Sequence, residues 1–370
     1  MDKQYANDIN SLKTGESVDS TFVVSRKTLK KTKSGDDYCL ICLQDRSGSI
    51  DGVIWPEVLK NNQFEVGDFV KIKGDVEDNK YAEGAKKQLK ITQLKKVGDK
   101  KDIEYSDFIR TTKKNIDEMI GEMESFIESI KNIYLKKLLN LFFEDEKFRN
   151  QFFNSSAAVQ YHHAYMGGLI EHTLAVTKIC DWLSGIYENL NRDLIVSGAI
   201  LHDIGKIKEY ELDSIIKISD EGRLLGHITI GYGMVLEKIN EIKGFPEDLK
   251  ERLLHIILSH HGYKEFGSPK RPKILEAFVV FHVDNMDADV GGFNIILEES
   301  GGQADWSAFL KNFERSVLLR GLKSLNNHHD TDTESTEINR GNNRNKLDKL
   351  DNSDSAGSLK KDEVAQNELF

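Results

Sequence analysis

The pattern of apolar residues changes near residue 101, and this change constrains the fold more than any other feature. Before it, short β-branched and aromatic runs alternate with turn signals, as in STFVVSRKTLK and DYCLICLQD. After it, apolar residues recur every three or four positions, beginning with FIRTTKKNIDEMIGEMESFIESI. The first pattern is typical of strands and the second of amphipathic helices. The sequence therefore predicts a β domain followed by an α domain.

The order of elements in the first hundred residues defines the β domain more narrowly. Three predicted strands end with SIDGVIW, the segment PEVLKNNQF suits one short helix, and two strands follow in DFVKIKGDVE and QLKITQLKKV. Three strands, a helix and two strands form the element order of an OB-fold, a small five-stranded barrel that often binds single-stranded nucleic acid. The predicted fold class is therefore a multidomain α and β protein with an N-terminal OB-fold.

Four segments are expected along the chain. The barrel occupies 1–98, a helical connector 99–155 and an all-α domain 156–322, leaving a polar tail over 323–370. This tail is rich in Asn, Asp, Ser and Lys and has almost no aromatic residues. Because it cannot bury enough apolar surface to offset its ordering entropy, we expect it to be disordered.

Composition excludes several classes of protein. No run approaches 18 consecutive apolar residues, so a membrane span is not expected. The opening MDKQYANDIN lacks the apolar core of a signal peptide, and three Cys cannot build a disulfide framework, so we expect a cytoplasmic protein. The net charge of −10 argues against a uniformly basic nucleic-acid coat.

Histidines are concentrated in the predicted α domain, where nine of the eleven fall between residues 162 and 282. His172 shares a helix face with apolar residues at offsets of −3, +4, +7 and +11, so it is predicted to be buried. The helix DLIVSGAILHDIGK ends in the adjacent pair His202 and Asp203, and we expect Gly205 to be its C-cap. His227 opens another helix, and His260 with His261 closes the helix PEDLKERLLHIILSHHG.

A buried acid completes the set. Asp284 has apolar neighbours on its helix face, and a buried carboxylate without a partner costs several kcal/mol. A cation is the obvious partner. The same helical geometry excludes His255, about 140° around its helix from His260, and His282, about 160° from Asp284. The candidate metal ligands are His172, His202, Asp203, His227, His260, His261 and Asp284.

The residue types in this set suggest which ions bind. Nitrogen and oxygen ligands without thiolate suit Mn²⁺, with Co²⁺, Fe²⁺, Ni²⁺ or Mg²⁺ as alternatives. Seven ligands exceed the need of one ion. Two ions bridged by one carboxylate would use them all and would suit in-line hydrolysis of a phosphate ester, with Asp203 as the bridge.

The strings GGLIEHT, ILHDIGK and LSHHG, followed by Asp284, resemble the signature of HD-domain metal-dependent phosphohydrolases. Together with HHGYKEFGSPKRPKILEAFVVFHVDNMDA and the OB-like N-terminus, they more narrowly resemble the YhaM family of 3′-to-5′ exoribonucleases, over residues 12 to about 320. The resemblance implies that His172, His202, Asp203 and Asp284 hold a first metal. It implies that His227, His260 and His261 hold a second metal, with Asp203 shared.

Four residues are candidates for contact with the substrate. The resemblance matches Lys206 to a lysine near the scissile phosphate, although a solvated cation at a helix end is the alternative. His163 could contact a phosphate or protonate a leaving oxygen, or it could be structural. Lys270 and Arg271, in GSPKRP, are candidates for holding the substrate backbone, or they form a solvated basic loop.

The barrel offers candidates for contact with single-stranded RNA or DNA. The aromatic residues Phe22, Tyr38, Trp55 and Tyr81 could stack on bases, although most strand aromatics belong to a core. Phosphate contacts are expected from a basic segment that contains Lys27, Lys30, Lys31 and Lys33. Cys39 and Cys42 are three apart on a strand and face opposite ways, so they are not expected to bind zinc.

Together these features predict a metal-dependent 3′-to-5′ exoribonuclease that releases nucleoside 5′-monophosphates from single-stranded RNA. One alternative is a phosphodiesterase for a nucleotide second messenger, which would have no evident use for an OB-like domain. Another is a non-catalytic RNA-binding protein with structural metals, which leaves the excess of ligands unexplained. The sequence does not indicate the oligomeric state.

Overall fold

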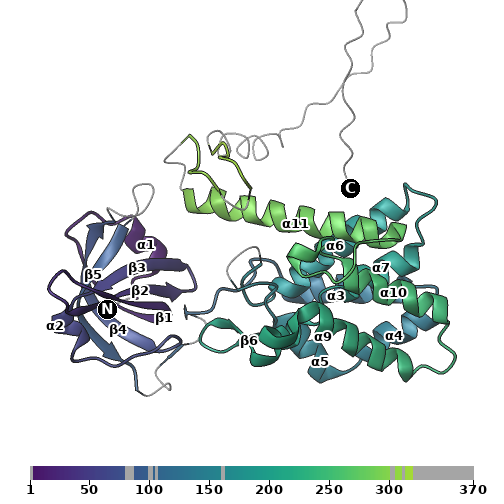
Figure 1. The fold of residues 1–370 in the computed structure, drawn as a ribbon, viewed down its shortest axis with the longest axis horizontal. Helices are drawn as coiled ribbons and strands as arrows, with labels where there is room; N and C mark the ends of the chain where they lie inside the picture. The colour runs from purple at the N-terminus through teal and green to yellow at the C-terminus, as the bar shows by residue number, and fades with distance from the viewer. Residues whose placement is uncertain are drawn as a thin grey trace, which may run out of the picture. The chain divides into compact units, whose positions relative to one another are not determined.

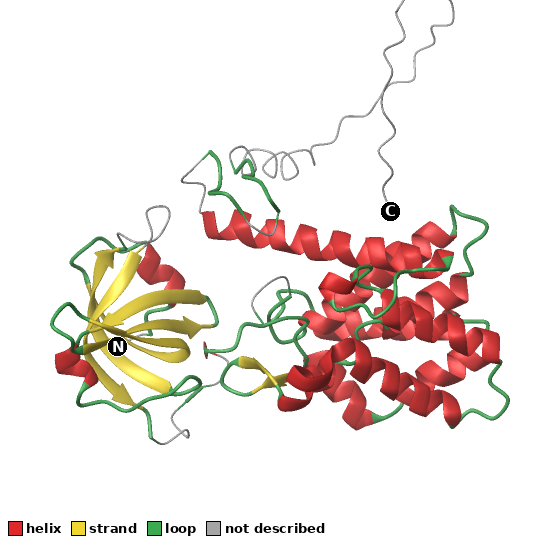
Figure 2. Cartoon of the chain, viewed as in Figure 1, coloured by secondary structure: helices red, strands yellow, loops and turns green. Residues whose placement is uncertain are grey.

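The computed structural model describes most of the chain up to Leu319. The described residues are 3–79, 87–98, 103–104, 107–159, 163–300, 305–310 and 313–319, without the side chains of 298–300. The predicted tail over 323–370 lies outside them. Figure 2 shows one part of the chain made mainly of strands and another made mainly of helices.

The first part is a closed barrel with the strand order β1-β2-β3-β5-β4 (Figure 1). β3 and β5 pair in parallel, whereas the other neighbours are antiparallel. This arrangement confirms the predicted OB-fold, with one short helix between β3 and β4. The bounds are β1 Ser17–Lys31, β2 Asp37–Asp45, β3 Gly48–Ile54, α2 Pro56–Leu59, β4 Phe69–Asp78 and β5 Lys87–Lys96.

Side chains alternate between the two faces of each strand, and those on the inner face fill this barrel. On β2 the burial pattern alternates residue by residue, so Cys39, Ile41 and Leu43 point inward, while Tyr38 and Cys42 are only partly buried. Cys39 and Cys42 are free thiols on opposite faces of the strand, as predicted. A short helix that the sequence pattern did not predict, α1 Ala6–Asn10, packs on the barrel, where the Ala6 amide donates to Asp45 Oδ2 at 2.8 Å.

The second part is helical and shares one apolar core that runs from Met119 to Val283. Side chains at the N-caps satisfy the first amides of several helices, as Asn132 does for Tyr134 and Leu135. The bounds are α3 Ile116–Ser129, α4 Ile133–Phe143, α5 Glu146–Asn154, α6 Gly168–Ser184, α7 Arg192–Leu201, α8 Lys206–Glu209, α9 Asp220–Asn240, α10 Glu247–Ser259 and α11 Leu275–Ser300.

Three further elements differ from the sequence prediction. Helix α3 begins at Ile116, so the preceding FIRTTKK is not helical. A two-stranded hairpin, β6 Tyr210–Leu212 and β7 Ile216–Ile218, interrupts the helices. Its strands have three residues each, which is too short for an alternating pattern to stand out. The residues 305–310 and 313–319 are also not helical.

Gly205 has a different role from the predicted left-handed C-cap. Its φ of −68° is right-handed, and α7 is instead capped by His202. A Cβ at residue 205 would lie 2.1 Å from the backbone oxygen of His227 and 2.6 Å from the amide of Gly231. Glycine is therefore needed because the backbone of the α7–α8 turn touches the backbone of α9.

Gly205→Ala is expected to destabilise the protein by about 3 kcal/mol, because neither backbone can move without disturbing the core. Gly233→Ala, on the exposed side of α9, is the matched control. Its new Cβ would meet open space, so it should stabilise by about 0.5 to 1 kcal/mol. Urea unfolding of both variants measures the difference, and equal stabilities would contradict the contact.

Candidate metal centre

All seven predicted ligands lie in two groups that meet at Asp203. One group joins His172, His202, Asp203 and Asp284, and the other joins Asp203, His227, His260 and His261. They come from α6, the α7–α8 turn, α9, the C-terminal end of α10 and α11. Residues that are far apart in the sequence therefore converge as predicted.

The first group is the more completely buried. His172 and His202 have no exposed surface, and Asp203 is 1% exposed. His172 Nε2 lies 3.2 Å from His202 Nε2, 3.3 Å from Asp203 Oδ2 and 3.2 Å from Asp284 Oδ1. His202 Nε2 lies 3.4 Å from Asp203 Oδ2.

The second group surrounds the other oxygen of the same carboxylate. Asp203 Oδ1 lies 3.5 Å from His227 Nε2 and 3.4 Å from His260 Nε2. His261 completes the group, with its ring centre 4.4 Å from that of His260 and 5.0 Å from that of His227. Asp203 thus presents one oxygen to each group.

The backbone conformation of α9 orients one imidazole of the second group, that of His227. Helix α9 has a kink at Gly226, where φ is 69°, and His227 begins the second half of the helix. A residue with a side chain rarely adopts this conformation. The kink therefore sets the direction in which His227 enters the site.

The spacing of these atoms fits divalent cations. Two ligands at about 2.1 Å from one ion lie about 3.0 to 3.4 Å from each other for ordinary coordination angles. In addition, Asp203 Oδ1, His227 Nε2 and His260 Nε2 are buried and make no hydrogen bond with any described residue. Buried polar atoms rarely lack a partner, so both the spacing and these atoms indicate a place for a cation.

The electrostatics of the two groups differ. Burial opposes a positive charge on His172, but hydrogen bonds with Asp203, Asp284 and Asp287 outweigh it and raise its pKa well above the usual value. In the second group, burial lowers the pKa of His227 and His260, and it lowers the pKa of His261 to about 4. These last three imidazoles are neutral at pH 7, the state that binds metals.

Lys206 lies inside the centre. It is only 6% exposed, and its Nζ lies 2.6 Å from Asp203 Oδ2. Burial opposes the charge of Asp203, but Lys206 and His202 outweigh it and hold the pKa of this carboxyl well below its usual value. The alternative of a solvated cation at a helix end is therefore wrong for Lys206.

Two carboxylates beside the centre were not predicted. Asp287 Oδ2 lies 2.7 Å from His172 Nδ1, and Glu209 Oε2 lies 2.7 Å from His227 Nδ1. Asp287 could have been found from the sequence, because it follows Asp284 by three residues on the same helix face. Glu209 carries no such signal, because it ends the four-residue helix α8.

His163 belongs to a third group, with His172 and Asp287. Its Nε2 lies 3.0 Å from Asp287 Oδ2 and its Nδ1 lies 2.9 Å from the Tyr165 hydroxyl. Because His172 turns its Nε2 toward Asp203 and Asp284, Asp287 stands behind the first group. His163 therefore lies one residue away from the predicted ligands, and its catalytic role stays a prediction.

The two excluded histidines lie outside all three groups formed by the described residues. His255 Nε2 accepts a hydrogen bond from the Lys273 amide at 2.8 Å. His282 is exposed and contacts the rings of Phe278 and Phe281. Both therefore lie where their helical positions predicted, away from the metal centre.

Of the aromatic residues predicted to contact bases, some lie on the surface of the barrel and one lies in its core. Tyr38 and Trp55 stack on each other with ring centres 5.4 Å apart, and Trp55 is 40% exposed. Phe22 is fully buried in the barrel, so its prediction as a base-stacking residue is wrong. Tyr81 lies outside the described residues.

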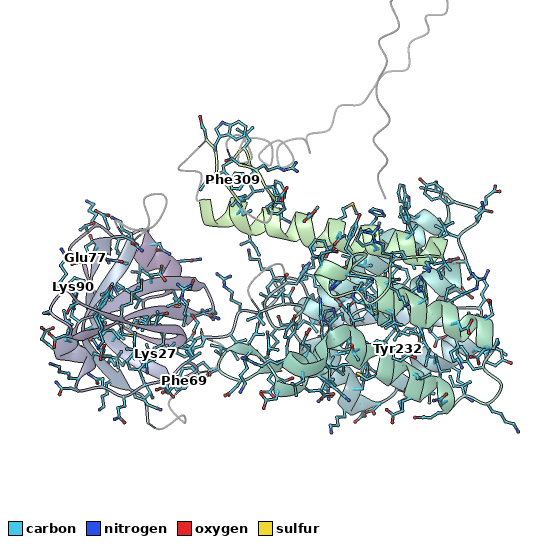
Figure 3. All side chains as sticks on the ribbon, in the orientation of Figure 1. Lys27, Phe69, Glu77, Lys90, Tyr232 and Phe309 are labelled. Atoms are coloured by element: carbon cyan, nitrogen blue, oxygen red, sulfur yellow. The ribbon has the colours of Figure 1, made fainter. Side chains whose placement is uncertain are left out.

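The four predicted lysines of the barrel have different surroundings. Lys27, labelled in Figure 3, donates to the Phe64 carbonyl at 2.6 Å and pairs with Glu65. Lys31 pairs with Asp37 at 2.8 Å. Lys30 is exposed and lies opposite Tyr38 on the neighbouring strand, and Lys33 is exposed in the following turn.

The basic loop of the helical domain is also on the surface. Lys270 and Arg271 are exposed in the loop after the 3₁₀ helix η3, Lys264–Phe266. The Arg271 guanidinium lies over the Tyr263 ring, 4.9 Å from its centre.

Within the described part of the chain, no helix is both long enough and apolar enough to cross a membrane.

Family models match both parts of the chain. A family model described as an HD domain matches residues 169–289, and one described as an OB-fold nucleic acid binding domain matches 23–97. Among solved structures, the HD domain of the Listeria monocytogenes phosphodiesterase PgpH is 22% identical and covers 36% of this chain and 74% of its own, with a TM-score of 0.25.

Full-length relatives are more informative. The 3′-5′ exoribonuclease YhaM of Listeria innocua is 31% identical over 289 residues, which span 77% of this chain and 90% of the relative. The Bacillus subtilis protein of the same name is 31% identical over 287 residues, with 77% and 88% covered. The chain therefore belongs to the YhaM family, as its sequence motifs predicted.

Proposed function

We propose that this protein is a metal-dependent 3′-5′ exoribonuclease that shortens single-stranded RNA and releases nucleoside 5′-monophosphates. The observation that carries the proposal is the buried carboxylate of Asp203, which presents one oxygen to each of two groups of metal ligands. Membership of the YhaM family and the adjoining OB-fold support RNA as the polymer that is cut. Single-stranded DNA is a second substrate to test.

Two divalent ions, with Mn²⁺ as the favoured metal, would occupy the two groups. When bound, such ions stabilise negative charge on a phosphoryl group and lower the pKa of a water molecule. His172, His202 and Asp284 would hold one ion, the second group of imidazoles would hold the other, and Asp203 would contact both.

Residues of the chain would handle the substrate around these ions. Lys206, which reaches Asp203 from within the centre, would neutralise charge on the scissile phosphate. Water would attack phosphorus, the P–O3′ bond would break, and a proton would pass to the departing 3′ oxygen. His163, held by Asp287, is the proposed donor of that proton. Lys270 and Arg271 would bind the RNA backbone.

The exposed stack of Tyr38 and Trp55 would hold bases on the barrel. Lys30 lies beside it and Lys33 is exposed nearby in the sequence, so we propose these two as the main phosphate contacts. Lys27 and Lys31 already pair with acidic side chains and would contribute less. The three free cysteines fit the cytoplasm as the compartment.

Activity is tested by incubating the metal-stripped, Mn²⁺-reconstituted protein with 5′-labelled single-stranded RNA. The wild type should give a ladder that shortens from the 3′ end, with nucleoside 5′-monophosphates as products. Asp203→Ala should reduce the rate by about 10³-fold or more, since metal stabilisation of the transition state is worth several kcal/mol. His282→Ala, outside the centre, should behave as the wild type. Intact RNA together with hydrolysis of a small cyclic or linear nucleotide would favour the second-messenger alternative.

Metal binding is tested without turnover, by thermal unfolding of the metal-free protein with and without Mn²⁺. An ion that binds only the folded state should stabilise it by about 2.7 kcal/mol at a concentration 100 times its Kd. Asp203→Ala should lose most of this response, because both groups lose a ligand, whereas His282→Ala should keep it. A melting temperature of the wild type that does not respond to Mn²⁺, Co²⁺, Fe²⁺, Ni²⁺ or Mg²⁺ would contradict the metal centre.

RNA binding is tested on metal-free protein, so that the strand stays intact. Trp55→Ala should weaken the affinity for single-stranded RNA by about 5- to 150-fold, because stacking on one base is worth about 1 to 3 kcal/mol. Trp182→Ala is the matched control, since Trp182 is 66% exposed on α6. Equal Kd values for both variants, measured by fluorescence anisotropy, would show that the Tyr38–Trp55 stack is not part of the RNA-binding surface.

A further inference from the structure

Every imidazole of the two metal-ligand groups is held through its Nδ1 atom. Three of them meet backbone carbonyls: His202 lies 2.7 Å from Ala199 O, His260 lies 2.8 Å from Ile257 O, and His261 lies 2.8 Å from Phe266 O. A carbonyl oxygen can only accept, so Nδ1 carries the hydrogen. In neutral His202, His260 and His261, Nε2 therefore keeps the lone pair that a metal needs.

The other two imidazoles meet carboxylates instead. Asp287 Oδ2 faces His172 Nδ1 and Glu209 Oε2 faces His227 Nδ1, both at 2.7 Å. Both acids lie within hydrogen-bond distance of a buried imidazole, and Asp287 Oδ2 also lies 3.0 Å from His163 Nε2. An ionised acceptor strengthens the hydrogen bond and makes the ring a more basic ligand.

These two carboxylates are divided between the two groups. His172 belongs to the first group and His227 to the second, so each group contains one imidazole backed by a carboxylate. The two acids also come from different elements, since Asp287 lies on α11 and Glu209 ends α8. Neither acid belongs to the two ligand groups that share Asp203.

Local packing holds Glu209 in place. The Glu209 Oε1 atom accepts the amide of His227 at 3.3 Å, so both carboxylate oxygens contact the same residue. Gly222 of α9 packs against Glu209, because a Cβ there would lie 2.5 Å from its backbone oxygen. The carboxylate and the imidazole are thereby fixed relative to each other before any ion binds.

We propose that Asp287 and Glu209 are positioning residues, each of which sets the affinity of one metal ion independently of the other. The proposal rests on the proposed two-ion centre. Asp287 orients His172 and tunes the ion of the first group, whereas Glu209 orients His227 and tunes the ion of the second. Substitution of one acid should therefore weaken one binding step and leave the other step unchanged.

The experiment is a titration of metal-free protein with Mn²⁺ alone, in which the electron paramagnetic resonance signal of the hydrated ion reports the free concentration. The wild type should bind two ions per chain. Asp287→Asn and Glu209→Gln should each weaken one of the two steps by about 10- to 100-fold, because outer partners of ligating histidines have effects of this size. Asp289→Asn, an exposed acid two residues from Asp287, is the matched control and should titrate as the wild type.

The same substitutions made in a His202→Ala variant identify the ion whose binding each acid affects. His202→Ala removes a ligand of the first group, so the remaining tight ion should report the second group. In this background Glu209→Gln should weaken the affinity for that ion by about 10- to 100-fold, whereas Asp287→Asn should leave the affinity unchanged. Circular dichroism of each variant confirms that the comparison is made between folded proteins.

The outcomes separate this proposal from the one on which it rests. If the wild type binds two ions and the substitutions leave both steps unchanged, the assignment of Asp287 and Glu209 is overturned while the metal centre stands. If either substitution weakens both steps equally, the claim of independent tuning is overturned. If the wild type binds no Mn²⁺, the two-ion centre itself fails, and the positioning roles fail with it.

Discussion

The buried carboxylate of Asp203 is the constraint on which the centre depends. A charged group with 1% exposure costs many kcal/mol unless its partners replace the lost water. Its oxygens are therefore surrounded, with Lys206 and the first group on the Oδ2 side and His227 and His260 on the Oδ1 side. Because one anion is shared, the elements that carry these partners must meet at one point.

The helical core makes this convergence possible. Residues that bind nothing themselves determine how closely the helices approach, and Gly205 is the clearest case, since α9 touches the backbone beside Asp203. The ligand imidazoles then keep their orientation through Nδ1, which leaves Nε2 pointing into the centre. Packing therefore determines the position of each side chain, and the hydrogen bonds determine which ring nitrogen of each imidazole faces the centre.

The residues that converge in the two groups could be predicted from the sequence, because a buried histidine or acid on an apolar helix face is costly without a partner. The same reasoning extends to Asp287, which shares the face of Asp284. It does not reach Glu209, whose contact with His227 spans 18 positions and depends on how α8 meets α9. On the barrel, composition could not separate buried Phe22 from exposed Trp55, because Phe22 points into the barrel from β1, whereas Trp55 follows the end of β3 as the N-cap of α2.

Charge explains why binding of a polyanion at the helical centre should depend on metal. The carboxylates in or behind the two groups are Asp203, Asp284, Asp287 and Glu209, and the ammonium of Lys206 contacts Asp203. With the positive charge that the raised pKa of His172 implies, the formal charge of the metal-free centre at pH 7 is −2. This region alone would repel a phosphodiester. With two divalent cations and all five imidazoles neutral, the formal charge would be +1. The proposed stacking of bases on Tyr38 and Trp55 would need no ion, so we expect a chelator to affect RNA binding by the barrel less than RNA binding by the helical centre.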